Sequence, residues 1–95
     1  MSRARYTPTA RQDMQRLLTQ IARERPEAGH RFLDRIRKTC RLLARAPAIG
    51  TARDDIASGL RCFSIGSYVI YFRAAKDGVE VLRVVHGAQD ESQFF

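Results

Sequence analysis

Residues 60–87 constrain the fold more than any other part of this chain, because they contain three short β-type runs separated by two tight turns. Gly66-Ser67 is a two-residue connection that suits a type II′ hairpin, in which glycine takes the positive φ angle. Asp77-Gly78 is a second strong hairpin signal. The pattern predicts a compact sheet with strands over residues 60–65, 68–73 and 79–85.

Two helical patterns precede this sheet. Thr7 offers an N-cap oxygen and Pro8 fits a first helical turn, so a helix is expected to begin there. Pro26 interrupts the pattern, and a second helix is expected from Glu27, with an apolar stripe as far as Ala44. Two helices joined by so short a linker are expected to pack as an antiparallel hairpin. The stripe of the first helix consists of Ala10, Met14, Leu17, Leu18 and Ile21.

The remaining segments complete the order of elements. Residues 3–7 are expected to form a short first strand. Residues 46–59 hold one Pro and two Gly without periodicity and are expected to form a loop, which Ile49 and Ile56 attach to the core. The prediction is a single α+β domain over residues 1–95 with the order βααβββ, in which an N-terminal strand and a helical hairpin pack on a small antiparallel sheet.

The last two strands carry apolar side chains on both faces. One face is expected to cover the helices, while the other exposes more apolar surface than a solvated face normally does. That surplus suggests a binding face. Strict alternation assigns Tyr68, Ile70, Phe72, Val79, Val81 and Val85 to one face and Val69, Tyr71, Leu82 and Val84 to the other.

The net charge of +7 is concentrated in the N-terminal half of the chain. Residues 1–45 carry 12 Arg and Lys against 4 Asp and Glu, a net charge of +8, whereas residues 46–95 carry 5 against 6, a net charge of −1. Fifteen of the 17 basic residues are arginine, whose planar fork of donors suits carboxylates and phosphates. The implied partner is nucleic acid or an acidic protein.

Several classes of protein are not indicated. The chain has no run of about 18 apolar residues and no apolar segment behind its first residues, so a cytoplasmic protein with no membrane partner is expected. Cys40 and Cys62 lack C-x-x-C spacing, and reduced, mostly buried thiols are expected. Metal-binding spacings, a P-loop, G-x-S-x-G and G-x-G-x-x-G are missing from the sequence, so neither a metal nor a cofactor is expected.

An arginine lies within or at the end of each β-type run: Arg61, Arg73 and Arg83. Cleavage of RNA through its 2′-hydroxyl needs a base, an acid and a group that stabilises the phosphorane charge, and these arginines with Tyr71 and His86 could supply them. Strand alternation, however, predicts His86 and Arg83 on opposite faces of the sheet. Two other interpretations stay open: charged flanks that discourage edge pairing, and contacts to a partner.

The helix arginines, among them Arg11, Arg16 and Arg31, have two interpretations as well. They form either a solvated face or a surface that contacts a partner.

Three strings, taken in order, carry a family resemblance. They are T-P-T-A-R-Q-D-M near the start, R-F-L-D-R-I-R-K-T-C-R-L-L-A-R-A-P across the second predicted helix, and G-L-R-C-F-S-I-G-S-Y-V-I-Y-F-R followed by V-L-R-V-V-H-G-A-Q-D. With this spacing the chain resembles the ParE branch of the RelE/ParE superfamily, the toxic halves of bacterial type II toxin–antitoxin pairs, which include plasmid stabilisation systems. The resemblance covers nearly the whole chain and implies a helical hairpin on a small antiparallel sheet.

The resemblance also implies an activity. Nuclease members of the superfamily use basic residues on the sheet and a tyrosine near the C-terminus. In this chain their arginine after the turn falls on Val69, and their C-terminal arginine and tyrosine fall near Gln89 and Phe95. This departure favours the ParE branch, for which the implied action is poisoning of DNA gyrase without catalysis. The alternative is a ribosome-dependent messenger RNA endoribonuclease of the RelE type.

The resemblance further implies a ParD-type antitoxin, an acidic and partly disordered chain that folds as it wraps the basic hairpin and the sheet. Direct binding of nucleic acid by the isolated toxin is not expected. The alternative nuclease would use Arg61, Arg83 and His86. The residues expected to contact the antitoxin or the target are Arg11, Arg16, Arg31, Arg61, Arg73 and Arg83.

Overall fold

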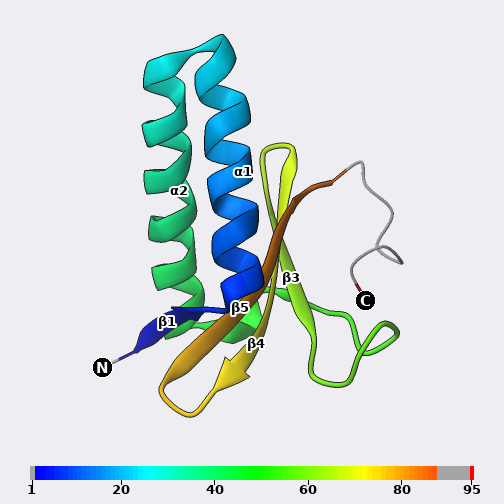
Figure 1. Cartoon of the computed structure of the whole chain (residues 1–95). Coiled ribbons are helices and arrows are strands. Elements are labelled where there is room, and N and C mark those ends of the chain that lie inside the picture. The colour runs from blue at the N-terminus through cyan, green and yellow to red at the C-terminus, as the bar shows by residue number, and fades with distance from the viewer. Residues whose placement is uncertain (1, 88–94) are drawn as a thin grey trace.

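In the computed structural model, which describes residues 2–87 and residue 95, two helices lie against one face of a five-stranded sheet (Figure 1). The strand order is β1-β5-β4-β3-β2, in which β1 is parallel to β5 and the other pairs are antiparallel. The α+β class and the predicted order are confirmed. The elements are β1 (Arg3–Tyr6), α1 (Pro8–Glu24), α2 (Pro26–Arg45), the 3₁₀ turn η1 (Pro47–Ile49), β2 (Thr51–Ala52), β3 (Arg61–Ile65), β4 (Tyr68–Ala75) and β5 (Gly78–His86).

α1 begins where the sequence predicts, and α2 begins one residue before its predicted start. The Thr7 hydroxyl oxygen accepts a hydrogen bond from the Ala10 amide at 3.0 Å, and Pro8 occupies the first turn of α1. Arg25 is the only residue between the helices, and Pro26 takes the first turn of α2, one residue earlier than predicted. Neither helix is both long and apolar enough to cross a membrane.

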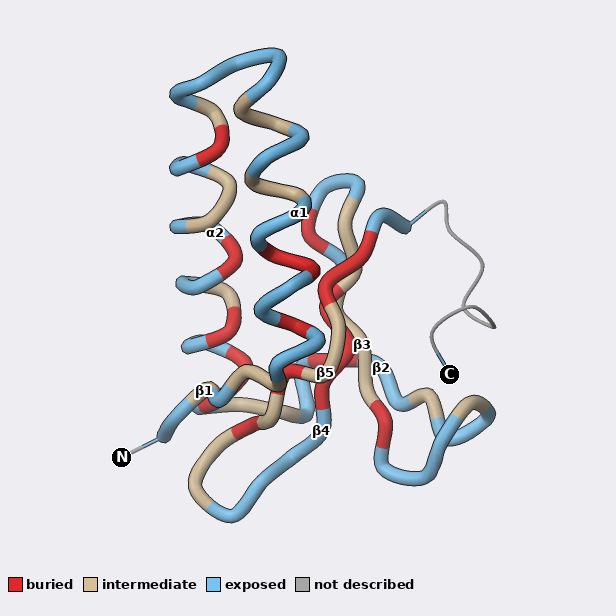
Figure 2. Tube along the Cα trace, in the orientation of Figure 1, coloured by how far each residue is buried: buried red, intermediate tan, exposed pale blue. Residues whose placement is uncertain are grey.

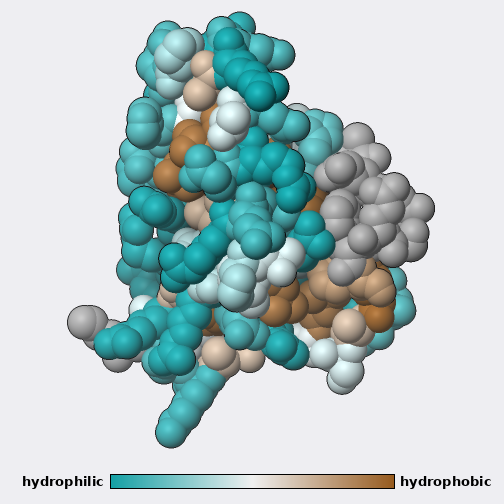
Figure 3. Space-filling view, in the orientation of Figure 1, coloured by the Kyte–Doolittle hydropathy of each residue, from teal (hydrophilic) through white to brown (hydrophobic). Residues whose placement is uncertain are grey.

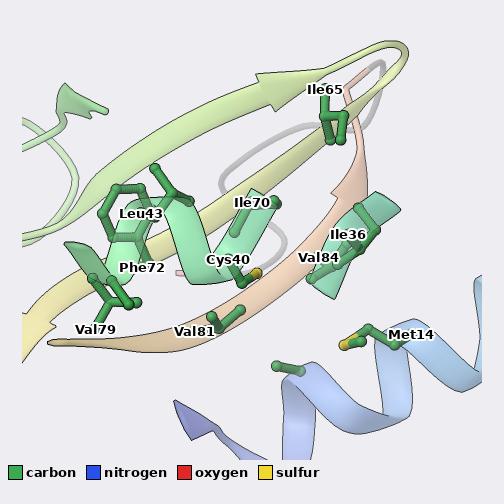
Figure 4. Close-up of a cluster of buried hydrophobic side chains, with 12 residues drawn as sticks. Met14, Ile36, Cys40, Leu43, Ile65, Ile70, Phe72, Val79, Val81 and Val84 are labelled. Carbon is green, nitrogen blue, oxygen red and sulfur yellow. The ribbon is translucent and has the colours of Figure 1, made fainter. Parts of the chain in front are cut away.

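The main core lies between the hairpin and the sheet (Figure 4). Ile36, Cys40 and Leu43 of α2 are fully buried against side chains such as Phe72 and Val81 of the sheet. Burial of one such apolar side chain contributes about 1.5–3 kcal/mol to stability. The hairpin therefore stays on the sheet through the inner stripe of each helix, while its far end is mostly exposed or half-buried (Figure 2).

The cysteines behave as the sequence predicts. Cys40 and Cys62 are free thiols; Cys40 is buried and Cys62 is half-buried. Burial raises the pKa of the Cys40 thiol to about 11, so it stays protonated and acts as a small apolar residue.

The second face of the sheet is less exposed than predicted. Leu60, Tyr71 and Val85 form a small buried cluster there, against which half-buried residues including Ile56 pack. The segment before β3 covers this face because it is held by its own bonds, such as the Arg53 amide to the Leu60 carbonyl at 2.7 Å. Apolar residues are still visible on this side of the molecule, below the grey segment (Figure 3).

A register shift between β4 and β5 changes the predicted faces. Tyr71 pairs with Arg83 but Phe72 pairs with Val81, so one residue of β5 is left without a direct partner. Beyond this bulge the alternation is reversed: Val84 enters the main core and Val85 the second cluster. The assignment of these two valines from strict alternation was therefore wrong.

Two local predictions also need correction. The predicted loop over residues 46–59 contains η1 and the two-residue strand β2, which pairs with Cys62 and Arg61. The second hairpin turns at residues 76 and 77, because Ala75 pairs with Gly78. Gly78 is already in β5 with a φ of +152°, and a Cβ there would overlap the backbone of Arg3 in β1. Glycine at this position thus permits the parallel pairing of β1 with β5.

Gly78→Ala is expected to lower the free energy of unfolding by about 3 kcal/mol or more, since the new methyl group adds a backbone overlap to an unfavourable φ. Gly59→Ala is the matched control: Gly59 also has a positive φ, +77°, but nothing lies within 4 Å of its Cβ position. Its expected cost is about 1 kcal/mol. Urea unfolding measures both, and equal losses would contradict the role given to Gly78.

Candidate functional site

Arg83 is held by a buried carboxylate on α1. Its Nε and one terminal nitrogen donate to Asp13 Oδ2 and Oδ1, each at 2.8 Å, and the Val84 amide donates to Oδ2 at 3.0 Å. The Asp13 side chain is only 1% exposed and the Arg83 side chain 18%. The bonds to Asp13 are the main cause that raises the pKa of Arg83, which stays charged.

This contact completes the edge of β5. β1 ends at Tyr6, so the part of β5 beyond Val81 has no neighbouring strand on that side. The Thr7 hydroxyl donates to the Leu82 carbonyl at 3.0 Å, and the Asp13 carboxylate accepts from the Val84 amide. Side chains at the start of α1 thus replace the missing strand by satisfying the backbone groups that it would have bound.

Asp13 was missed by the sequence analysis. It lies three residues after Ala10 and four before Leu17, both in the apolar stripe of α1. A carboxylate on a buried helix face is uncommon unless it is paired. The position of Asp13 in the apolar stripe was therefore the sequence feature that could have indicated a buried partner.

The other two sheet arginines also have partners within the chain, in separate places. Arg61 donates to the carbonyl oxygens of Pro47 at 3.1 Å and Gly50 at 2.6 Å, which fixes η1 against β3. Arg73 donates to Glu80 Oε1 at 3.1 Å, across the β4–β5 pair and at the surface. The three arginines therefore do not converge on one site.

The candidate nuclease residues are not gathered either. Arg61 pairs with Phe72 and His86 with Tyr68, so they are separated by four residues along β4, about 14 Å. Arg83 and His86 both lie beyond the bulge, so the predicted alternation between them is unchanged: Arg83 pairs with Tyr71 of the second cluster and His86 with Tyr68. The Arg83 guanidinium nevertheless reaches Asp13 on α1, and the His86 ring lies edge-on to the Tyr68 ring at 5.5 Å. His86 is exposed.

Val69 and Phe95, two of the positions compared with nuclease members, lie beside the second cluster of the sheet. Val69 is half-buried in the second cluster, and the Phe95 ring lies 5.1 Å from the buried Tyr71 ring. Gln89 lies outside the described residues.

In the described part of the chain, no group of three His, Cys, Asp or Glu side chains is placed to hold a metal ion.

The helix arginines lie on the surface of the hairpin. Arg16 is 3.9 Å from Asp13 Oδ1. Arg11 lines a groove of about 470 Å³ between β1 and the helices, and Arg31 lines another of about 390 Å³ between α2 and the β3–β4 turn. Within the part of the chain that the structure describes, neither Arg11 nor Arg31 forms an ion pair. The uncompensated positive charge thus belongs to the hairpin, whereas the sheet arginines are neutralised or bound to carbonyls.

Asp13→Ala is expected to lower the free energy of unfolding by about 3 kcal/mol or more, because it removes the buried carboxylate that accepts from the Arg83 guanidinium and the Val84 amide. Arg73→Ala removes an exposed pair from the same sheet and is expected to cost less than about 1 kcal/mol. Urea unfolding of both variants measures the difference. A loss for Asp13→Ala as small as that for Arg73→Ala would show that the buried contact is not needed.

Comparison with known proteins identifies relatives of this chain. Residues 4–91 match the family model described as the ParE toxin of the type II toxin–antitoxin system parDE. The proteins called Toxin ParE1 in two Mycobacterium tuberculosis strains, CDC 1551 / Oshkosh and ATCC 25618 / H37Rv, are each 31% identical to this chain over 65 residues. That segment spans 67% of this chain and 66% of each relative, just under two thirds of the relative's length.

A solved structure shares the fold. A chain from the chromosomal ParDE TA system of P. aeruginosa superposes with a TM-score of 0.76 and 18% identity, over 90% of this chain and 96% of the other. At this identity the likeness concerns the fold alone. Together with the family match over residues 4–91, it leads to one conclusion: the chain belongs to the ParE toxin family of type II toxin–antitoxin systems.

Proposed function

We propose that this ParE-type toxin arrests growth by binding DNA gyrase and that a ParD-type antitoxin neutralises it. The observation that carries the choice of a binding mechanism over a nuclease is the internal use of the sheet arginines. Arg83 is bound by Asp13, and Arg61 by the carbonyls of η1. A phosphorane-stabilising group needs donors aimed at the substrate, and these donors are aimed at the protein itself.

The charge of the hairpin supports the antitoxin half of the proposal. Hydrophilic residues cover most of the visible hairpin surface (Figure 3), and arginines such as Arg11 and Arg31 have no carboxylate partner among the described residues. An acidic antitoxin would be steered to this surface and would supply the missing carboxylates. The ParDE system of the P. aeruginosa structure offers a precedent for such a pairing. With gyrase as target, the toxin acts in the cytoplasm.

The six arginines expected at an interface are not equivalent in this proposal. Arg11, Arg16 and Arg31 are exposed on the hairpin and are assigned to partner contacts. Arg61 and Arg83 are assigned first to the fold, and Arg73 is an exposed secondary candidate.

A gyrase assay tests the proposal. Purified toxin is expected to inhibit supercoiling or to trap cleaved DNA, and the protein encoded beside its gene is expected to reverse the effect. His86→Ala is the informative variant, because His86 is exposed and its replacement should leave both the fold and the inhibition unchanged. Cleavage of messenger RNA on ribosomes that is lost in His86→Ala, without any effect on gyrase, would contradict the proposal and favour the nuclease alternative.

A further inference from the structure

We propose that the groove between α2 and the β3–β4 turn is the surface with which the toxin binds its target. The groove would receive a segment of gyrase that carries an apolar side chain next to a carboxylate. This assignment rests on the proposed function, since it takes gyrase as the target. It goes further by naming the surface, the arginines and the chemistry of the gyrase segment.

The groove has an apolar floor. It has a volume of about 390 Å³, and it is lined by Ile36 of α2 and Ile65 of β3, which both belong to the main core (Figure 4). Phe32 and Tyr68 also line it, with their ring centroids 4.8 Å apart. An apolar side chain of a partner would be removed from water here. His86 contacts the Tyr68 ring but does not line the groove, so the variant His86→Ala leaves the lining unchanged.

The lining of the groove is held in place by the fold itself. Ile65 pairs with Tyr68, and the Gly87 amide donates to the Ser67 carbonyl at 2.7 Å, which joins the turn to the end of β5. Phe32 packs against the main core. A groove that is already formed loses little conformational entropy when a folded protein docks on it. A partly disordered antitoxin can instead wrap a longer surface, so this short groove suits the folded target better.

The charges beside the floor select a carboxylate. Arg31 and Arg35 lie one helical turn apart on α2, and both line the groove. A Cβ at Gly66 would lie 3.8 Å from a terminal nitrogen of Arg35, so this guanidinium group reaches the turn. Among the described residues neither arginine has an ion-pair partner, and no acidic residue lines the groove. An Asp or Glu of the partner would accept two parallel bonds from such a fork.

A protein segment fits this groove better than a nucleic acid. Arginine forks bind phosphates as well as carboxylates, so the charges alone do not separate the two classes. The floor does separate them, because Ile36 and Ile65 offer an aliphatic surface with no side-chain donor for a phosphate or a base edge. Aromatic residues next to arginine are also the composition that protein interfaces favour. An aliphatic or aromatic side chain of gyrase would therefore fill the floor while its neighbouring carboxylate meets Arg35.

Charge reversal with a matched control tests the two arginines. Arg31→Glu with Arg35→Glu changes the groove, and Arg37→Glu with Arg41→Glu changes other positions of α2 by the same net charge. All four side chains are exposed, and circular dichroism and thermal unfolding check that both variants are folded. Both variants weaken long-range attraction equally. Only the groove variant is expected to raise the toxin concentration for half-inhibition of supercoiling by roughly 30-fold or more over the control. Equal inhibition by the two variants, or a larger loss in the control, would overturn the assignment.

A filled groove tests the apolar floor. Ala28 is half-buried and lines the groove, so Ala28→Phe places a ring where the side chain of the partner would lie. Gln12→Phe adds the same ring to an exposed position of α1 outside the groove. Surface plasmon resonance with immobilised gyrase is expected to show roughly tenfold or weaker binding for Ala28→Phe and unchanged binding for Gln12→Phe. Binding of Ala28→Phe at wild-type affinity or above would contradict the proposal.

Binding to other molecules identifies the occupant. The variant with Arg31→Glu and Arg35→Glu is expected to bind the protein encoded beside the toxin gene no more weakly than the control variant does. A specific loss of binding to that protein, or to free duplex DNA, in place of gyrase would overturn the assignment to gyrase. A wild-type toxin without any effect on gyrase would overturn the proposed function itself, whereas a groove variant that inhibits gyrase as well as the wild type would overturn the groove alone.

Discussion

The contact of Asp13 with Arg83 and Val84 fixes how the helical hairpin, which packs through its apolar stripes, sits on the sheet. Without it, the Val84 amide at the edge of β5 beyond the last pair with β1 would lose its acceptor, and the mostly buried Arg83 would lose its carboxylate. Such a buried pair adds little net stability compared with apolar packing, but the loss of one partner is costly. The contact therefore fixes how α1 sits on β5 more than it adds to the total free energy.

The same contact limits which functions Arg83 can perform. An arginine that holds a buried carboxylate is unavailable to a phosphate, and Arg61 is engaged with η1 in the same way. Two of the arginines that suggested an RNA-cleavage site in the sequence, Arg61 and Arg83, thus form bonds within the fold. The surplus of positive charge is left on the hairpin, where arginines such as Arg11 and Arg31 form no ion pair with the described residues.

Local chemistry explains what could be predicted from the sequence. Thr7 and Pro8 define a helix start, and glycine at position 66 defines a hairpin turn, because each acts through its nearest neighbours. The bulge in β5 opposite Tyr71 and Phe72 could not be predicted, since it is a property of how two strands pair and the alternation within one strand does not reveal it. The contact of Asp13 with Arg83 spans 70 residues along the chain, so nearest-neighbour patterns do not predict it. Its one indication in the sequence is an acidic residue within the apolar stripe of α1.

A double-mutant cycle on Asp13→Ala and Arg83→Ala tests the central claim most directly. If the two side chains stabilise one another as the geometry indicates, each single variant is strongly destabilised and the double variant is little worse than either. The expected coupling in the free energy of unfolding is about 2 kcal/mol or more. Losses that add to within about 0.5 kcal/mol would contradict the claim that this contact joins the hairpin to the sheet.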